Sequence, residues 1–207
     1  NWNSGLARPV VNYTTQTGIK PDKFGLYGQL RVKPFERLTL IGGGRLSWYD
    51  ATTTNLLSGA VTNRQTINAK VTPYAGAVFD LTEWLSAYSS YTEIFQPQTE
   101  TDISGTVLDP REGRQVEAGL KAEFFDGNVN ASMAYFNLRD VNRAVADPGN
   151  PGVSIAQGEV EVQGFEIEAS GTVLPGWEIS GGYTFTDSQY LNGGSAGQVF
   201  STYTPKH

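Results

Sequence analysis

Residues 115–135 read QVEAGLKAEFFDGNVNASMAY, and apolar and polar side chains alternate along most of this stretch. The apolar set is Val116, Ala118, Leu120, Ala122 and Phe124 before the turn and Val129, Ala131, Met133 and Tyr135 after it. The residues that alternate with them are Gln115, Glu117, Lys121 and Glu123 before the turn and Asn128, Asn130, Ser132 and Ala134 after it. A period of two predicts β-strands with one apolar face, and Asp126-Gly127 between them is typical of a tight turn. The stretch therefore predicts a β-hairpin.

The same alternation recurs along the rest of the chain. It covers residues 24–33, 38–49, 70–80, 84–91, 165–173 and 178–186. Tight turns are expected near 34–37, 80–83, 126–128 and 175–177, and longer polar connections near 50–69, 96–111, 144–158 and from 191 onward. We therefore predict an all-β chain of about eight antiparallel strands, in which short turns and long loops alternate.

None of the apolar faces carries a charged side chain, and this favours a membrane barrel over a soluble sandwich. A charge that faces lipid at the midplane of a barrel costs roughly 2–4 kcal/mol, so membrane strands keep one face free of charge. Strands of a soluble sandwich also alternate, but they usually have about five or six residues, whereas about ten are needed to cross a bilayer at a tilt. Aromatic residues near the strand ends suit interfacial girdles: Trp48, Tyr49, Trp84, Phe95, Trp177 and Tyr190.

Composition removes several classes of function. The net charge of -6 argues against a nucleic-acid partner, because phosphate binding requires a basic patch. With no cysteine and one histidine, His207, the chain lacks most hydrolytic triads and the usual zinc sites. The acidic segment 159–161 lacks the spaced Asp/Asn/Gly loop of a Ca²⁺ site. The chain has no run of about 18 apolar residues that would form a transmembrane helix. We therefore expect neither an enzyme nor a metal site.

Residues 119–136, GLKAEFFDGNVNASMAYF, resemble a barrel hairpin of the TonB-dependent siderophore receptors. Further segments are similar to other motifs of that family, in the same order along the chain. They are FGLYGQ (24–29), LTLIGGGR (38–45), YSSYTEIFQPQ (88–98), EGRQVEA (112–118), NLRDVN (137–142), GFEIEASG (164–171) and TPKH (204–207). The resemblance covers about residues 23–207 and is greatest to receptors for hydroxamate-type or pyoverdine-type siderophores.

The resemblance implies a transmembrane barrel of about 22 strands, in the outer membrane of a Gram-negative cell, that encloses an N-terminal plug domain. It implies that the loops and the plug bind a ferric siderophore, which the TonB complex admits by acting on the plug. The siderophore would be a transported ligand, with no cofactor bound by the chain itself, and the complete barrel would be a monomer in outer-membrane lipid. Residues 1–207 would form a middle arc of the barrel domain; both ends are expected to be truncated and the plug to be absent.

Ligand contacts are expected on lumen-facing or loop positions near the extracellular rim. Arginine forks and tyrosine faces suit the oxygen-rich, often anionic surface of ferric siderophores. The candidates are Tyr49, Tyr74, Arg111, Arg114, Arg143 and Tyr190, and the alternative for each is a girdle residue or a solvated loop residue. A structural polar wall inside the barrel is expected from Arg31, Arg45, Lys121, Glu117, Glu166 and Glu168.

Two other functions stay open at the level of sequence. A passive porin or small structural outer-membrane barrel would be self-contained and would lack a plug, and eight strands can close a small barrel. An outer-membrane hydrolase would need a serine or aspartate with a histidine, and the single histidine lies at the end of the chain. The family motifs favour a receptor and transporter wall for ferric siderophores, energised through TonB.

Overall fold

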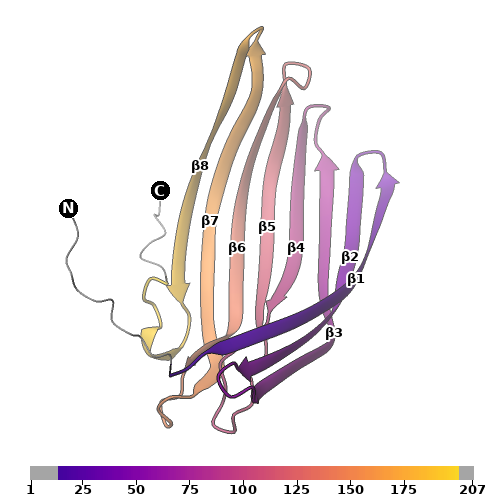
Figure 1. Cartoon of the computed structure of the whole chain (residues 1–207). Helices are drawn as coiled ribbons and strands as arrows, with labels where there is room; N and C mark the ends of the chain where they lie inside the picture. Colours follow the sequence, from indigo (N-terminus) through magenta and orange to yellow (C-terminus); the bar gives the residue numbers. More distant parts are fainter. Residues whose placement is uncertain (1–13, 201–207) are drawn as a thin grey trace, which may run out of the picture.

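The computed structural model describes residues 14–200, which form one antiparallel β-sheet (Figure 1). Its strands are β1 (Thr17–Phe35), β2 (Leu38–Asn55), β3 (Val61–Asp80), β4 (Leu85–Gln96), β5 (Arg111–Phe124), β6 (Val129–Ala146), β7 (Ser154–Leu174) and β8 (Trp177–Tyr190), followed by a short 3-10 turn, η1 (Gly193–Ser195). Each strand pairs with its neighbours in sequence, so the predicted all-β fold of eight antiparallel strands is confirmed. His207 and the TPKH motif lie outside the described residues.

No helix within residues 14–200 is long and apolar enough to cross a membrane.

The connections differ between the two ends of the sheet. At one end, called the turn end here, β1–β2, β3–β4, β5–β6 and β7–β8 are joined by short turns (Figure 1). Gly127 and Gly176 in two of these turns have φ angles of 85° and 80°, which glycine adopts without steric cost. The loops 56–60, 97–110 and 147–153 lie at the opposite end, the loop end. The predicted alternation of short turns and longer loops is therefore confirmed.

Two of the loops are shorter than predicted, because the strands continue beyond the alternating segments. β2 runs to Asn55 and β3 begins at Val61, so most of the connection expected at 50–69 is paired strand. β6 and β7 likewise extend into the connection expected at 144–158. The β2 extension carries polar residues on both faces, including the threonines at 52–54, so it has β-propensity without an apolar period.

The register brings the apolar faces of all eight strands onto one side of the sheet. Leu120 on β5 lies opposite Ala87 on β4 and opposite Met133 on β6. Met133 lies opposite Ile167 on β7, which in turn pairs with Tyr183 on β8. A slip of one residue in any ladder would turn the polar residues of a strand to this side. The agreement across the sheet therefore indicates one continuous apolar surface.

This apolar surface has no covering layer within the described part of the chain. Only five hydrophobic residues are buried in that part, whereas Leu30 (67%) and Met133 (50%) are among many large apolar side chains that stay exposed. Soluble proteins rarely expose continuous apolar patches of such extent, and a soluble sandwich would bury this face under a second sheet. The structure therefore favours lipid as its surroundings.

Aromatic pairs lie near both edges of the apolar band. Near the turn end, the ring centroids of Trp84 and Phe124 are 5.7 Å apart, and toward the loop end those of Phe24 and Trp48 are 5.4 Å apart. On β2 about ten residues separate Leu38 from Trp48, which is roughly 33 Å of strand and spans roughly 25 Å at a tilt of about 40°. That height matches the apolar band of outer-membrane barrels.

Two aromatics that were expected in the girdles lie instead on the polar face. Tyr49 lies on the same face of the sheet as Ser47, and its neighbour Trp48 lies on the apolar face, because successive side chains of a strand point to opposite faces. Tyr190 likewise shares its side with Ser188 and pairs with Val160. The girdle interpretation is therefore wrong for these two residues, although position near a strand end suggested it.

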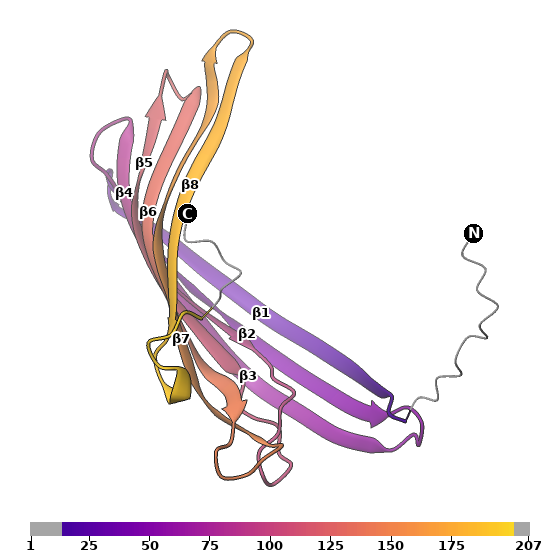
Figure 2. The same ribbon diagram turned by 90° about the vertical axis from the view of Figure 1, so that its left-hand side faces the viewer.

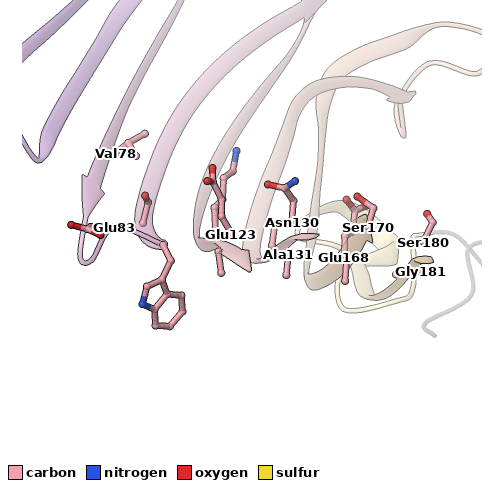
Figure 3. Close-up of a pocket in the computed structure, with 16 residues that line it drawn as sticks. Val78, Glu83, Glu123, Asn130, Ala131, Glu168, Ser170, Ser180 and Gly181 are labelled. Carbon is pink, nitrogen blue, oxygen red and sulfur yellow. The ribbon is translucent and has the colours of Figure 1, made fainter. Parts of the chain in front are cut away.

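The polar face is the concave side of the sheet. An open hollow of about 660 Å³ lies on it near the turn end and reaches from β3 to β8. Its lining includes Glu123, Asn130, Glu168 and Ser180 from four consecutive strands (Figure 3). The apolar face is therefore convex, as expected for an arc of barrel wall around a polar lumen.

The sheet is an open arc. In the described residues β1 and β8 do not pair with each other, so each leaves one edge of the sheet free, apart from the loop end of β8, where residues 188–190 pair with residues 197–200. The small closed barrel that eight strands could form is therefore not the structure of this chain.

Strands β3 and β4 separate toward the loop end. Their ladder ends at Tyr74 and Thr92, although β3 extends back to Val61. Figure 2 shows β1–β3 directed away from β4–β8 in this region. An ion pair between Lys70 and Glu112 crosses the gap. A side-chain ion pair thus connects β3 with β5 where the backbone hydrogen bonds between β3 and β4 have ended.

Met133 and Ser132 are neighbours on β6 that face opposite sides, so they form a matched pair for testing the assignment of faces. We expect Met133→Arg to lower the free energy of unfolding of the full-length protein in lipid vesicles by about 2–4 kcal/mol, because it places a charge in lipid. Ser132→Arg adds the same charge opposite Glu168 on the concave face and should change it by less than about 1 kcal/mol. Urea unfolding measures both values, and equal losses would contradict the assignment.

Residues 1–207 expressed alone should aggregate without detergent. The free edges of β1 and β8 offer unpaired backbone groups, and the convex face offers a continuous apolar surface to other molecules. Size-exclusion chromatography with light scattering checks this. A monodisperse monomer of the chain in detergent-free buffer would count against the membrane assignment.

Candidate functional site

An ion cluster lies on the concave face at the loop end of β5 and β6. Arg111, the first residue of β5, donates to both carboxylate oxygens of Asp140, from Nε at 3.3 Å and from Nη2. Arg143 donates to the same carboxylate from Nη1. The side chains of Arg111, Asp140 and Arg143 are 30%, 16% and 23% exposed. Two guanidinium groups and one carboxylate leave a net positive charge in a partly shielded position.

Arg143 connects this cluster to aromatic residues at and after the end of β8. Its guanidinium carbon lies 4.7 Å from the ring centroid of Phe200, and Phe200 meets Tyr190 edge to face at 5.3 Å. The negative face of an aromatic ring attracts a guanidinium, which helps to hold Arg143 in place. Three of the six predicted ligand contacts, Arg111, Arg143 and Tyr190, are thus brought together through Asp140 and Phe200.

Apolar side chains lie beside the ion cluster on the same face. Phe136 has the parity of Asp140 on β6, and a Cβ built on Gly164 would come within 2.9 Å of the Phe136 ring. In the same way, a Cβ on Gly113 would come within 2.8 Å of Ile94. The two glycines therefore leave room for these side chains to lie across the sheet. The surface next to the cations is consequently able to cover an apolar part of a ligand.

Two aspartates stabilise the loops at this end. Asp102 accepts hydrogen bonds from the hydroxyl of Ser104 at 2.6 Å and from the backbone N–H of Thr106, which lower the pKa of its carboxyl group. The side-chain amide of Asn150 donates to Asp147 at 2.9 Å and, with backbone N–H groups, lowers the pKa of Asp147. A lowered pKa means that these contacts stabilise the loops at neutral pH and are lost as the pH falls through the folded-state pKa.

Tyr49 and Tyr74 lie apart from the ion cluster, on the concave face of β2 and β3. The hydroxyl of Tyr74 donates to Oε1 of Gln29 at 3.0 Å, and its ring lies over Gly43. The ammonium of Lys23 lies 5.4 Å from the ring centroid of Tyr49. Tyr49 also lines a cavity of about 370 Å³ that reaches the loop end of β4. These tyrosines form a second polar surface, on the other side of the gap between β3 and β4.

Arg114 is the one candidate that the register places on the convex side. It lies two residues from Val116 on a strand without a bulge, so both side chains share a face. Its ladder partners are Glu93 and Arg139, and its Nε lies 3.9 Å from Oε1 of Glu93. Charged side chains thus reappear on the convex face beyond the apolar band. The sequence contained a signal for this position, because counting alternate residues back from Val116 places Arg114 on the apolar face.

The residues expected in the polar wall lie on the concave face: Arg31, Arg45, Lys121, Glu117, Glu166 and Glu168. Glu117 and Lys121 contact the same neighbour, Tyr88. The hydroxyl of Tyr88 donates to Oε1 of Glu117 at 2.6 Å, and Nζ of Lys121 lies 4.9 Å from the ring centroid of Tyr88. Around Tyr88, Glu117 and Lys121 the wall is therefore a linked polar surface.

Asp140 was missed by the sequence reasoning, although a signal for it exists. Side chains alternate along β6, so counting from Tyr135 on the convex face places Asp140 on the concave face. There it lies between Arg111 and Arg143, which were predicted as ligand contacts. In the part of the chain that the structure describes, no group of three or more His, Cys, Asp or Glu side chains could hold a metal ion. The chemistry of this end is therefore that of a cation-rich, partly apolar recognition surface.

The sequence matches the family model for TonB dependent receptor-like β-barrels over residues 1–207. The ferric-pyoverdine M114 receptor PbuA of Pseudomonas sp. (strain M114) is 37% identical over 196 residues, which cover 89% of this chain and 24% of that protein. The ferripyoverdine receptor of Pseudomonas aeruginosa is 34% identical over 217 residues, which cover 100% of this chain and 25% of that protein. The chain thus spans about a quarter of the length of these curated relatives.

Solved structures show the same arrangement of strands. The crystal structure of the ferripyoverdine receptor of the outer membrane of Pseudomonas aeruginosa, bound to ferripyoverdine, matches with a TM-score of 0.83 and 33% identity over 100% of this chain and 27% of that chain. The alcaligin outer-membrane receptor FauA from Bordetella pertussis matches with a TM-score of 0.81 and 34% identity over 92% of this chain and 33% of that chain. On the family match along its whole sequence, the chain belongs to the TonB-dependent receptors, as part of their β-barrel.

Proposed function

We propose that the chain forms part of the wall of an outer-membrane receptor that takes up ferric siderophores into a Gram-negative cell, with energy supplied through TonB. The observation that carries this proposal is the similarity to a ferripyoverdine receptor along the whole chain, in sequence and in structure. The convex apolar face supports contact with outer-membrane lipid, and the concave polar face supports a solvated lumen.

Further strands would close both edges of the sheet into a monomeric barrel of about 22 strands, the number found in plugged outer-membrane transporters. The hollow near the turn end supports contact between the wall and a plug domain. Lys121, Glu123 and Glu168 line this hollow with charge of both signs, which suits a polar domain surface and not a lipid or a second apolar layer. TonB would act on the plug and would reach this wall only through it.

The loop end of the concave face is the part that we assign to ligand contact. The candidates that face this side are Tyr49, Tyr74, Arg111, Arg143 and Tyr190, whereas Arg114 faces away. Each guanidinium has five N–H donors, and Asp140 uses only some of those on Arg111 and Arg143, so donors remain for an anionic oxygen of a chelate. Partial shielding from water strengthens such contacts. The ligand is transported without any covalent bond being made or broken.

A passive porin is the main alternative function. It would have the same convex face but would need no surface that combines shielded cations with apolar side chains. The similarity to ferripyoverdine receptors and the Arg111–Asp140–Arg143 cluster both favour a receptor with a specific ligand.

Fluorescence quenching of the full-length protein tests the proposed function. Ferric pyoverdine, a ferric hydroxamate chelate, cobalamin and a sugar would each be titrated against the protein in detergent. We expect saturable quenching by at least one ferric chelate. Binding of cobalamin or of the sugar, with no ferric chelate bound, would rule out the siderophore assignment and leave the barrel intact.

Arg143→Met tests the assigned ligand surface. It removes one cation while keeping an unbranched side chain, and it should raise the Kd for the bound ferric chelate about 10–100-fold, or about 1.4–2.8 kcal/mol. Arg64→Met is the matched control, because Arg64 is 69% exposed and pairs with Asp50 on the opposite side of the gap in the wall. The Kd of the Arg64→Met variant should stay within about twofold of the Kd of the unaltered protein. A Kd that is unchanged in Arg143→Met would remove the ion cluster from the ligand site.

A further inference from the structure

Gln98 holds two segments together at the loop end. It follows Pro97 just after β4, and only 6% of its surface is exposed. Its carboxamide nitrogen donates to the backbone carbonyl of Asp109 at 2.5 Å and to that of Asn142 at 2.7 Å. Its carboxamide oxygen accepts a hydrogen bond from the backbone N–H of Ala144 at 2.9 Å. A buried side chain thus bonds to three backbone groups, one in the 97–110 loop and two in β6.

The bonds from Gln98 to β6 lie on either side of Arg143, where the backbone is irregular. Asn142 has a φ angle of 59°, and the β6–β7 register shifts between Asp140 and Arg143 and again between Arg143 and Ala144. A positive φ is uncommon for a residue other than glycine and persists where surrounding contacts hold it. Asparagine tolerates this conformation better than most residues, and its own side chain donates to the carbonyl of Pro110 at 3.5 Å, while the carboxamide of Gln98 bonds to the backbone on both sides of Arg143.

The bulge sets the backbone position from which the side chain of Arg143 extends. The residue opposite Arg143 on β7 is Gly158, where a Cβ would lie 2.9 Å from both the Cβ and the carbonyl oxygen of Arg143. The two backbones therefore approach closely only because Gly158 has no side chain. From this position the Arg143 guanidinium reaches both Asp140 and Phe200.

Resting on the proposed function, we infer that Gln98 is a positioning residue for ligand binding, which holds the 142–144 bulge and so places the Arg143 guanidinium that meets the anionic part of a ferric chelate. Other side chains do not reproduce its contacts. Glutamate lacks the two N–H donors, leucine lacks all polar atoms, and asparagine is shorter by one methylene group. The loop 97–110 is thereby coupled to the ligand surface although its own side chains need not touch the ligand.

Hydrogen exchange of the full-length protein tests the bulge contacts whether or not a siderophore binds. Gln98→Leu keeps a side chain of similar size and removes the three hydrogen bonds, so exchange of the Ala144 amide should accelerate about tenfold or more. Residues 129–136 in the first half of β6 should keep their protection, which shows that the barrel is folded. Gln96→Leu is the matched control, an exposed glutamine at the end of β4 two residues before Gln98, and should leave Ala144 unchanged. Unchanged exchange at Ala144 in Gln98→Leu would overturn the inference.

Binding measurements separate positioning from general loosening of the loop. We expect Gln98→Leu to raise the Kd for ferric pyoverdine about tenfold in the unaltered background and less than about twofold in Arg143→Met, because Gln98 acts through Arg143. An equal fold-change in both backgrounds, or no change in either, would overturn the positioning role. If the unaltered protein binds no ferric chelate at all, the proposed function fails, and the exchange experiment still decides whether Gln98 holds the bulge.

Discussion

The absence of charge from one side of the sheet is the constraint on which the rest of the structure depends. In lipid, a charged side chain has no water to solvate it, so the side chains between the two aromatic edges of the convex face must all be apolar, small or aromatic. Since side chains alternate along a strand, every charged group in the same segments must point into the lumen. The register then has no freedom, because a slip of one residue would exchange the two faces of a strand.

The chemistry of the protein is therefore confined to the concave face and to the region beyond the apolar band. Where the band ends, charges return to the convex side as well: Glu93, Arg114, Arg139 and Glu161 lie directly opposite one another across β4 to β7. Beyond this level the strands extend as ladders in which polar and apolar residues no longer alternate regularly, and side-chain contacts such as Gln98 with 142–144 supplement the ladders. The candidate ligand surface begins there, next to the last apolar residues of the concave side.

The strands and the tight turns could be predicted from the sequence because lipid imposes a period of two and the turns need glycine at positive φ, as at Gly127. The ends of the strands toward the loops could not, since a segment such as 50–55 has polar residues on both faces and no period to count. The faces of Arg114, Tyr49 and Asp140 could have been predicted, because counting alternate residues from the nearest apolar residue toward the loop end gives the correct face for each. Gln98 had no such signal, because its partners come from segments far away in the sequence and are backbone groups.

The family match explains why this geometry recurs in receptors that carry different siderophores. The lipid-facing pattern fixes the wall, while the loop end is free to vary in charge and shape. In this chain the loop end carries two arginines that share one carboxylate. One of them, Arg143, extends from the bulge at 142–144 and lies against the ring of Phe200. The lumen wall between the loop end and the turn-end hollow is the linked polar surface around Tyr88, Glu117 and Lys121.

The central claim, that the convex face of this sheet meets lipid and the concave face does not, is tested most directly by nitroxide labels along β6. This part of the protein has no cysteine, so single cysteines at positions 129–136 can be labelled one at a time in the full-length protein in lipid vesicles. Oxygen concentrates in the bilayer, and collisions with it should be most frequent for labels at 131, 133 and 135 and least frequent at 130, 132 and 134. Maxima at the even positions, or no period of two, would contradict the account.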